Sequence, residues 1–404
     1  MPQTAKEEIA KNLRLSAGCL MAYMEPQGRL TSAPEGMAPF YISHVGRSGS
    51  CYLPDIADYD YPYTTLLRAD SLGRLTALGK SVLQRLGVVR RDAIHCYGEL
   101  TVLGADQQRQ IASRMVQRFP EVFGDGARID ARSTVDIPCI LSMESALQQL
   151  LVRNPRLAVS HEASRRDMDD LAGDYVRQPF VGNDTLLEFC RRHDQSSSLM
   201  AKFFNDADYV SREIDAVRFF HDYFRVVSSI QNTELRKKLS LYDTFTDDEL
   251  YHCWLCENSR SYVCFGASPL SGGRQPFTQC KLLRRMIAEA DSLIGIGRPG
   301  ASLRYASETT VAPLACLLAL NRFGQQLELE QLDRKGWRSY RLSPMAANIQ
   351  FVFYRTGTNS TDIVFKVLLN EDEATLPLKS NMAPYYRWKD FKEYCRQLLG
   401  DYGQ

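Results

Sequence analysis

The residues best suited to chemistry lie in a short glycine-bearing turn, Gly46-Arg47-Ser48-Gly49-Ser50. An apolar, β-rich run over 39–44 precedes the turn, so we predict a strand that ends in a loop. Such a loop is a natural anion site, in which Arg47 and Ser48 could donate hydrogen bonds. Arg47 could equally pair with a carboxylate of the protein.

Two other patterns suggest chemistry that their context does not support. Gly295-Ile-Gly-Arg-Pro-Gly300 has dinucleotide-binding spacing, but a true fingerprint follows a strand and opens a helix, whereas this one precedes a strand and contains Pro299. A serine hydrolase would need a nucleophile-elbow pattern, and the sequence has none. Neither class is expected.

The cysteines suggest two further sites. His252, Cys253 and Cys256 could begin a zinc site, but no second ligand pair at metal spacing is evident. The favoured interpretation is that these cysteines pack on a helix as small apolar groups. Cys51 invites comparison with cysteine phosphatases, yet Ala57 occupies the place of their phosphate-binding arginine.

Helix signals surround the loop. The segments 73–79 and 98–104 repeat one pattern, in which Thr76 and Thr101 are suited to cap the helix that follows. A periodic segment with Ile140, Met143, Leu147 and Leu151 on one face predicts a helix that ends at Asn154-Pro155.

The remaining patterns predict an α/β core that is split by a helical insertion. Residues from about 156 to 290 are mixed helical patterns, with a capping box from Thr246 to Glu249. Strand character returns at 302–306, before a helix through Leu320. The runs 348–354 and 362–369 are expected to pair as a hairpin.

Composition limits the function. The chain has 404 residues, 44% hydrophobic and 24% charged, enough for a large core, and its net charge of +1 argues against a general nucleic-acid binder. Met1–Asn12 is polar and no run could span a membrane, so we expect neither a signal peptide nor a membrane span. The eleven cysteines are scattered and odd in number, which leaves the redox compartment open.

Several motifs together carry a resemblance to a known family. The run 39–53 resembles the signature loop of histidine acid phosphatases, particularly bacterial multiple inositol polyphosphate phosphatases, which are phytase-like. Further similar segments, in matching order across nearly the whole chain, are 98–104, 132–134, 139–143, 303–308 and 384–388.

The resemblance implies a three-layer α/β core with an inserted, mainly helical cap domain. On this basis we expect the core at 1–152 and 292–404 and the cap at 153–291. It also implies an exported protein, periplasmic or secreted, although no signal segment is recognised, and the localisation stays open. No cofactor and no metal are expected.

The chemistry implied by the resemblance is largely missing. In the family a histidine attacks phosphorus and arginines clamp the phosphate. Here Arg47 is kept, but Ser48 stands at the nucleophile position. Cys51 and Pro138 stand where two further clamping arginines are expected.

The distal motif is degraded as well. Ser307 stands where a second phosphate-contacting histidine is expected, and Glu308 keeps the proton-donor position. Glu308 could instead serve only as a partner of the helix dipole. Arg304 could donate hydrogen bonds to a weakly held anion, and His44 is the nearest possible substitute nucleophile.

Three hypotheses follow. The leading one is a pseudo-phosphatase that uses its cleft to bind a phosphorylated small molecule, such as an inositol phosphate, or another ligand without turnover. The alternative is an active phosphomonoesterase of the inositol-polyphosphate class with Ser48 or His44 as nucleophile, which requires His44 to point into the pocket. The third is a non-enzymatic scaffold with a filled cleft.

Overall fold

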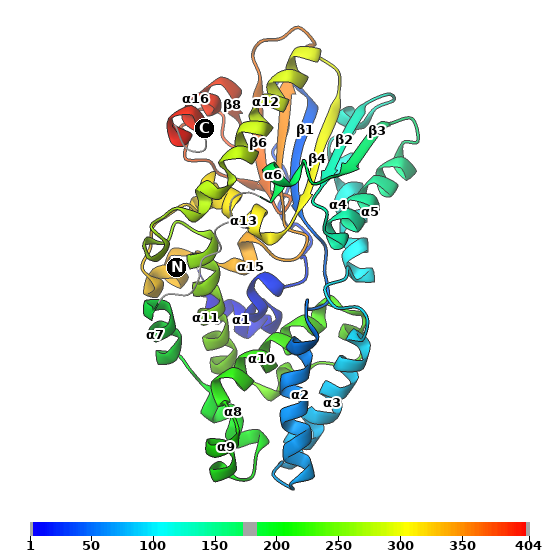
Figure 1. Cartoon of the computed structure of the whole chain (residues 1–404). Helices are drawn as coiled ribbons and strands as arrows, with labels where there is room; N and C mark the ends of the chain where they lie inside the picture. The colour runs from blue at the N-terminus through cyan, green and yellow to red at the C-terminus, as the bar shows by residue number, and fades with distance from the viewer. Residues whose placement is uncertain (1–2, 173–183, 401–404) are drawn as a thin grey trace.

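The computed structural model describes residues 3–172 and 184–400 and centres on one mixed sheet (Figure 1). The strands are β1 (Ala38–Arg47), β2 (Arg128–Ser133), β3 (Ala158–Ala163), β4 (Gly300–Ala306), β5 (Asn348–Arg355), β6 (Val364–Leu369), β7 (Asp372–Ala374) and β8 (Tyr386–Arg387). Their order is β3-β2-β4-β1-β5-β6-β7, with β8 also on β6. The first four are parallel and the rest alternate antiparallel from β5 onward. The carboxyl ends of β1, β2 and β4 therefore meet at one edge.

Helices cover both faces of the sheet. On one face α4 (Val102–Arg118) and α5 (Ile137–Arg153) pack on a cluster that includes Ile42, Leu303 and Tyr305. On the other, α12 (Cys280–Ile296), α13 (Glu308–Leu317) and α16 (Trp388–Leu399) belong to a larger cluster that also contains Val45 and Phe351. This arrangement confirms the expected layered α/β core.

A helical region extends from the carboxyl edge of the parallel strands (Figure 1). Its helices are α1 (Ala5–Lys11), η1 (Leu13–Leu20), α2 (Ile56–Ser71), α3 (Ala77–Ala93), α7 (Asp184–Arg192), α8 (Ser196–Phe203), α9 (Ala207–Glu213), α10 (Ala216–Ser229) and α11 (Asp247–Phe265). Shorter helices are η2 (Pro120–Phe123), α6 (Met168–Leu171), η4 (Ile230–Asn232), η5 (Glu234–Lys237), η6 (Tyr242–Thr244), η7 (Pro269–Ser271), η8 (Gln275–Gln279), η9 (Leu320–Arg322), η10 (Leu329–Gln331), α14 (Leu332–Lys335) and α15 (Ser339–Leu342). None of these described helices is long and apolar enough to cross a membrane.

The packing crosses the expected domain limits at two places. Strand β3 lies within the range 153–291 but pairs with β2 in the sheet. Helices α2 and α3 lie within 1–152 but pack on α10 and α8. Residues 173–183 of the predicted cap lie outside the described part of the chain. The division into core and cap stays a prediction.

Local signals in the sequence explain where the elements begin. The side chains of Thr76 and Thr101 accept hydrogen bonds from Gly79 N and Gly104 N and so cap α3 and α4 as predicted. Thr246 forms the predicted capping box with Glu249 at α11. The 348–369 hairpin is confirmed as β5 and β6.

Strand β1 is longer than predicted. It extends to Arg47 because both neighbours pair to its end: Arg47 lies in register with Ala306 of β4, and its N–H donates to Ala347 O at 2.7 Å. The turn therefore begins only at Ser48, and Arg47 is held by strand pairing.

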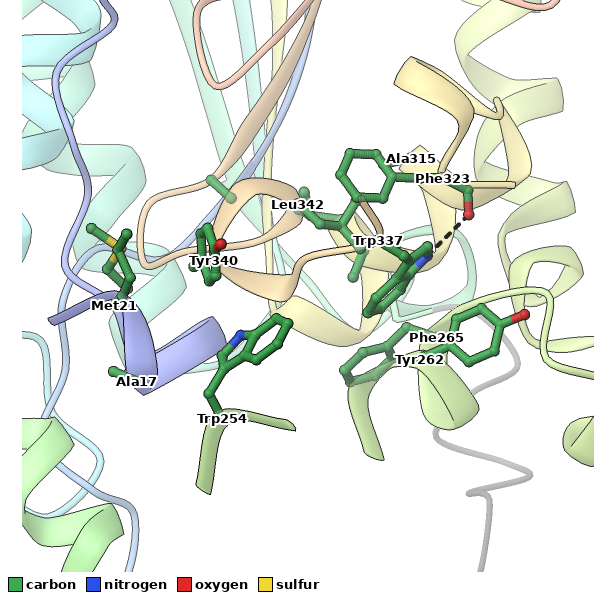
Figure 2. Packing of buried hydrophobic residues seen from close by; sticks show 14 of the residues in the cluster. Ala17, Met21, Trp254, Tyr262, Phe265, Ala315, Phe323, Trp337, Tyr340 and Leu342 are labelled. Atoms are coloured by element: carbon green, nitrogen blue, oxygen red, sulfur yellow. Dashed lines mark hydrogen bonds between the residues drawn. The ribbon is translucent and has the colours of Figure 1, made fainter. Parts of the chain in front are cut away.

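An aromatic cluster joins α11 to the segment 337–342, which includes α15 (Figure 2). Trp254 and Tyr262 of α11 pack against Tyr340 and Trp337, with ring centroids 5.8 and 5.1 Å apart. Trp337 Nε1 donates to Phe323 O at 3.1 Å. The η1 segment packs on α11 and α15. This packing places the end of η1 at the carboxyl edge of β1.

Candidate functional site

The candidate site lies where β1 and β4 end side by side. Because Arg47 is in register with Ala306, the next residues, Ser48 and Ser307, are brought together. Ser48 N donates to Ala306 O at 3.1 Å, and Glu308 follows as the first residue of α13. The structure thus brings together Arg47, Ser48, Ser307 and Glu308 from the predicted positions.

The loop after β1 is held between two helices. Gly49 N donates to Ser142 Oγ of α5 at 3.1 Å, and Ser50 N donates to Gln107 Oε1 of α4 at 2.9 Å. A side chain at Gly49 would place its Cβ 2.2 Å from Gly104 O, so glycine is required for this approach. The loop backbone is therefore fixed independently of any ligand.

The guanidinium of Arg47 is bound by groups of the protein itself. Its Nη1 donates to Cys19 O and to Ser343 O, both at 2.7 Å, which uses both Nη1 hydrogens. Its Nη2 lies 3.5 Å from Glu308 Oε2, and the Arg47 side chain is 9% exposed. Glu308 Oε1 also accepts from Ser343 Oγ at 3.3 Å. The arginine kept from the expected signature loop is thus paired internally.

The resemblance implies a nucleophile at position 48, and the Ser48 hydroxyl there has no activating partner among the contacts of the described residues. Ser48 is partly exposed, and its Oγ lies 3.9 Å from Cys51 Sγ, which also contacts Gly49 O at 3.1 Å. Burial raises the pKa of Cys51 to about 11, even though Ser48 and Arg47 act to lower it. A protonated thiol cannot take the proton of Ser48.

The resemblance implies an arginine at position 138 and a histidine at position 307, and small or rigid residues occupy both positions. Pro138 lies in the first turn of α5, where a residue without an N–H is tolerated. Ser307 Oγ is bonded to Thr309 Oγ1 at 2.6 Å. Neither residue supplies charge for an anion.

Arg304 does not contribute to the candidate site at the ends of β1 and β4. It is 4% exposed, forms an ion pair with Glu289 of α12, and lies 3.6 Å from Asp130 Oδ2. Both carboxylates neutralise its guanidinium. The geometry therefore indicates a structural ion pair in place of the anion contact considered from the sequence.

His44 does not meet the geometric requirement for a nucleophile. It is 1% exposed, and neither ring nitrogen has a hydrogen-bond partner. Its ring packs against Tyr305 and beneath Gly46, where a Cβ would come within 2.6 Å of the imidazole. Burial, followed by the charge of Arg304, lowers the pKa of His44 to about 3. The proposed substitute is thus a neutral core residue.

Two groups that complete the site were missed by sequence reasoning. Cys19 and Ser343 reach Arg47 through backbone carbonyls, which any residue could supply, so their types give no signal. Burial and the nearby carboxylate of Glu308 raise the pKa of the Cys19 thiol above its ordinary value. A protonated Cys19 thiol adds no charge beside the ion pair of Arg47 and Glu308.

No set of three histidine, cysteine or acidic side chains within residues 3–172 and 184–400 is arranged to hold a metal ion. Two cavities, of about 710 and 470 Å³, lie apart from Arg47. The first is lined by Tyr23, Phe323 and Arg341 among others, and the second by Arg118 and Lys366. Neither belongs to the site at the strand ends.

The fold was compared with known proteins. No family model and no curated protein matches the sequence. Among solved structures, multiple inositol polyphosphate phosphatase from Bifidobacterium longum, in complex with inositol hexasulfate, matches with a TM-score of 0.77 at 18% identity, over 96% of this chain and 98% of that one. The phytase from D. castellii matches with a TM-score of 0.73 at 12% identity, over 96% and 85%. The Hafnia alvei phytase in complex with myo-inositol hexakis sulphate reaches 0.50 at 11%, over 90% and 98%.

These likenesses cover nearly the whole chain and establish its fold. The segment 295–300, whose glycines have dinucleotide-binding spacing, precedes a strand as predicted. Gly297 caps the end of α12, and Gly300 begins β4. The chain therefore has the histidine acid phosphatase fold shared by inositol polyphosphate phosphatase and phytase structures.

Proposed function

We propose that this protein is a pseudo-phosphatase of the histidine acid phosphatase superfamily, which binds a ligand at the ends of β1 and β4 without turnover. The observation that carries the proposal is the internal pairing of Arg47 with Cys19 O, Ser343 O and Glu308. A phosphate would have to compete with these groups for the guanidinium. Ser307 and Pro138 offer no second cation.

The joint loss of several catalytic positions supports this proposal. Removing a nucleophile from a set of residues that act as a unit costs on the order of a millionfold in rate. Once Ser48 has replaced that nucleophile, loss of the arginines at 51 and 138 costs little more. Degradation of the whole set is therefore more consistent with lost catalysis than with one unusual substitution.

The ligand that we propose is a phosphorylated small molecule of the inositol phosphate class. The support is the likeness to the Bifidobacterium longum enzyme, whose structure contains inositol hexasulfate. Three partly exposed positions, Ser48, Cys51 and Ser307, leave polar groups at the surface of the site. Export of the protein, as is common in this superfamily, is part of the same proposal.

An active phosphomonoesterase is the second candidate. It is favoured by the proximity of Ser48 to Arg47 and Glu308, which could act as nucleophile, clamp and acid. Against it, Glu308 already accepts from Ser343 and faces Arg47, and no base within the described parts of the chain contacts Ser48. A scaffold whose surface alone matters is the third candidate, and it predicts no ligand at this site.

Phosphate release from phytate and from a chromogenic phosphate ester separates these candidates. We expect no turnover by the native protein above a Ser48→Ala control. A revertant that carries Ser48→His, Cys51→Arg, Pro138→Arg and Ser307→His is expected to gain turnover. If the native protein releases phosphate rapidly and Ser48→Ala abolishes that release, the proposal is overturned.

Ligand binding is tested separately. Thermal unfolding with inorganic phosphate, inositol hexakisphosphate and sugar phosphates is expected to show a rise in Tm with at least one of them, because a ligand that binds only the folded state stabilises it by mass action. The variant Arg47→Met should lose that rise. No rise with any anion would favour the scaffold.

A further inference from the structure

Two cysteines that do not belong to the candidate site meet between helices α7 and α11. Cys190 lies on α7 and Cys256 on α11, and their thiols share a hydrogen bond. Cys256 Sγ also lies 3.7 Å from the backbone oxygen of Cys190. The zinc hypothesis drew attention to Cys256, but no sequence pattern pairs it with Cys190, which is 66 positions away.

Cys190 and Cys256 are placed suitably for a covalent link. A disulfide requires Cα atoms about 4.4 to 6.8 Å apart and side chains that face each other. The Cys256 sulfur is hydrogen-bonded to the Cys190 thiol and lies 3.7 Å from the Cys190 carbonyl oxygen, so it faces its partner residue as a disulfide requires. Both cysteines are free thiols.

The histidines one turn away show how the helices are matched. His193, directly after α7, stacks on His252 of α11 with ring centroids 5.3 Å apart and planes 24° from parallel. Contacts at 190 with 256 and at 193 with 252 mean that the two segments run antiparallel. Because the two imidazoles stack face to face one turn from the sulfurs, their nitrogens do not converge with the thiols on a common point.

We propose that Cys190 and Cys256 form a redox-active dithiol that a peroxide oxidises to a disulfide between α7 and α11. In the first step the Cys190 thiolate attacks one peroxide oxygen, the O–O bond breaks, and hydroxide leaves, which gives a sulfenic acid. In the second step the Cys256 sulfur attacks the Cys190 sulfur and water leaves. In total, two thiols and one hydrogen peroxide give one disulfide and two waters.

The surroundings assign different roles to the two thiols. The hydrogen bond with Cys256 lowers the pKa of Cys190, burial opposes this, and Arg260 adds to the lowering. The same hydrogen bond, with burial, raises the pKa of Cys256. Cys190 is therefore the thiolate that attacks, and Cys256 is the proton-bearing partner that resolves. Since the two residues are 7% and 3% exposed, a small oxidant is required.

The test is peptide mapping of the whole native protein after treatment with one equivalent of hydrogen peroxide and alkylation of free thiols. We expect one cross-linked peptide pair that contains Cys190 and Cys256, that dithiothreitol reverses, and that forms at least tenfold faster than any other link. The oxidised protein should unfold a few degrees higher, because the link closes a long loop. Cys253 on the same helix, which is 1% exposed, should stay alkylatable after denaturation.

Two variants separate chemistry from folding. Cys190→Ser should abolish the link and the rise in Tm, whereas Cys253→Ser should leave both unchanged. The proposal is overturned if the native protein yields no 190–256 link, or if Cys190 accumulates as sulfinic acid instead. It is also overturned if the reduced protein binds one equivalent of Zn²⁺ that protects both thiols from alkylation, because the cluster would then be a metal site.

Discussion

Glu308 and Arg47 are joined both directly and through a third residue. Glu308 Oε2 lies 3.5 Å from Arg47 Nη2, while Ser343 donates its hydroxyl to Glu308 and accepts from Arg47 through its carbonyl oxygen. The three residues form a closed ring at the ends of β1 and β4. Any anion that binds Arg47 must therefore also contend with a carboxylate.

The first prediction concerns that carboxylate. Glu308→Gln should raise the affinity of the protein for inorganic phosphate about tenfold, or about 1.4 kcal/mol, because it removes a negative charge beside Arg47. The full Coulomb energy at this separation is larger, but the Glu308 side chain is 18% exposed and solvent screens part of it. Isothermal titration calorimetry measures the change.

Glu308→Asp is the matched control, since it keeps the charge and should leave the affinity near that of the native protein. Equal gains in both variants would mean that steric relief, and not charge, controls access to Arg47. No gain in either would mean that the guanidinium is unavailable for reasons other than Glu308.

Sequence patterns predicted the elements that carry the site better than the site itself. The strand ending near Ser48, the caps at Thr76 and Thr101, and the 348–369 hairpin all depend on neighbours in the chain, which a pattern records. The register of β1 with β4 is set by long-range pairing. Resemblance to a family was needed to place Ser307 beside Ser48.

The surroundings that set the charge and contacts of Arg304 and His44 could not be predicted from the sequence. Arg304 and His44 were candidates because of their types, but pairing with Glu289 and burial against Tyr305 give them structural places. Glu289 lies on α12, 15 positions before Arg304, and Tyr305 lies on β4, 261 positions after His44. Composition and spacing carry no record of such contacts.

The loop at Gly49 gives a second prediction. Gly49→Ala should lower the free energy of unfolding by about 3 kcal/mol, because its Cβ would lie 2.2 Å from Gly104 O and backbone cannot give way cheaply. Gly124→Ala is the control, since nothing lies within 4 Å of the added Cβ and its φ is −67°. Urea unfolding of both variants measures the difference. Equal stability of the two would mean that the loop is not clamped.

The third prediction concerns the N-terminal helix. Glu8 of α1 accepts from Tyr340 at 2.6 Å and pairs with Arg338 at 2.9 Å. Glu8→Gln should lower the free energy of unfolding by about 2 kcal/mol at pH 7, since a buried, charge-assisted bond is lost. Glu7→Gln on the same helix should change it by less than about 0.5 kcal/mol, because glutamine can also complete the capping box with Thr4.

The difference in stability between the native protein and Glu8→Gln depends on pH. Burial raises the pKa of Glu8, but the bond from Tyr340 and the charges of Arg341 and Arg338 outweigh it and leave the pKa below its ordinary value of 4.5. The stabilisation is therefore complete above about pH 4.5 and is lost as the pH falls through the lower value in the folded protein. The gap between native protein and Glu8→Gln should shrink in acid, and a constant gap would contradict the assignment.

The last prediction uses His44. Burial, with the charge of Arg304, holds the pKa of His44 at about 3 in the folded chain, against 6.5 for an ordinary histidine. Between these values the unfolded chain binds a proton that the folded chain does not, so stability falls as the pH is lowered through this window. From pH 7 to pH 5 this amounts to about 2 kcal/mol, at 1.36 kcal/mol for each pH unit below 6.5.

His44→Leu removes the titrating group and keeps an apolar side chain beneath Gly46, so its free energy of unfolding should fall about 2 kcal/mol less than that of the native protein between pH 7 and pH 5. Urea unfolding at the two pH values measures this difference without reference to activity. If His44→Leu and the native protein lose equal stability, the imidazole can be protonated within the fold, and its exclusion as a nucleophile would have to be reconsidered.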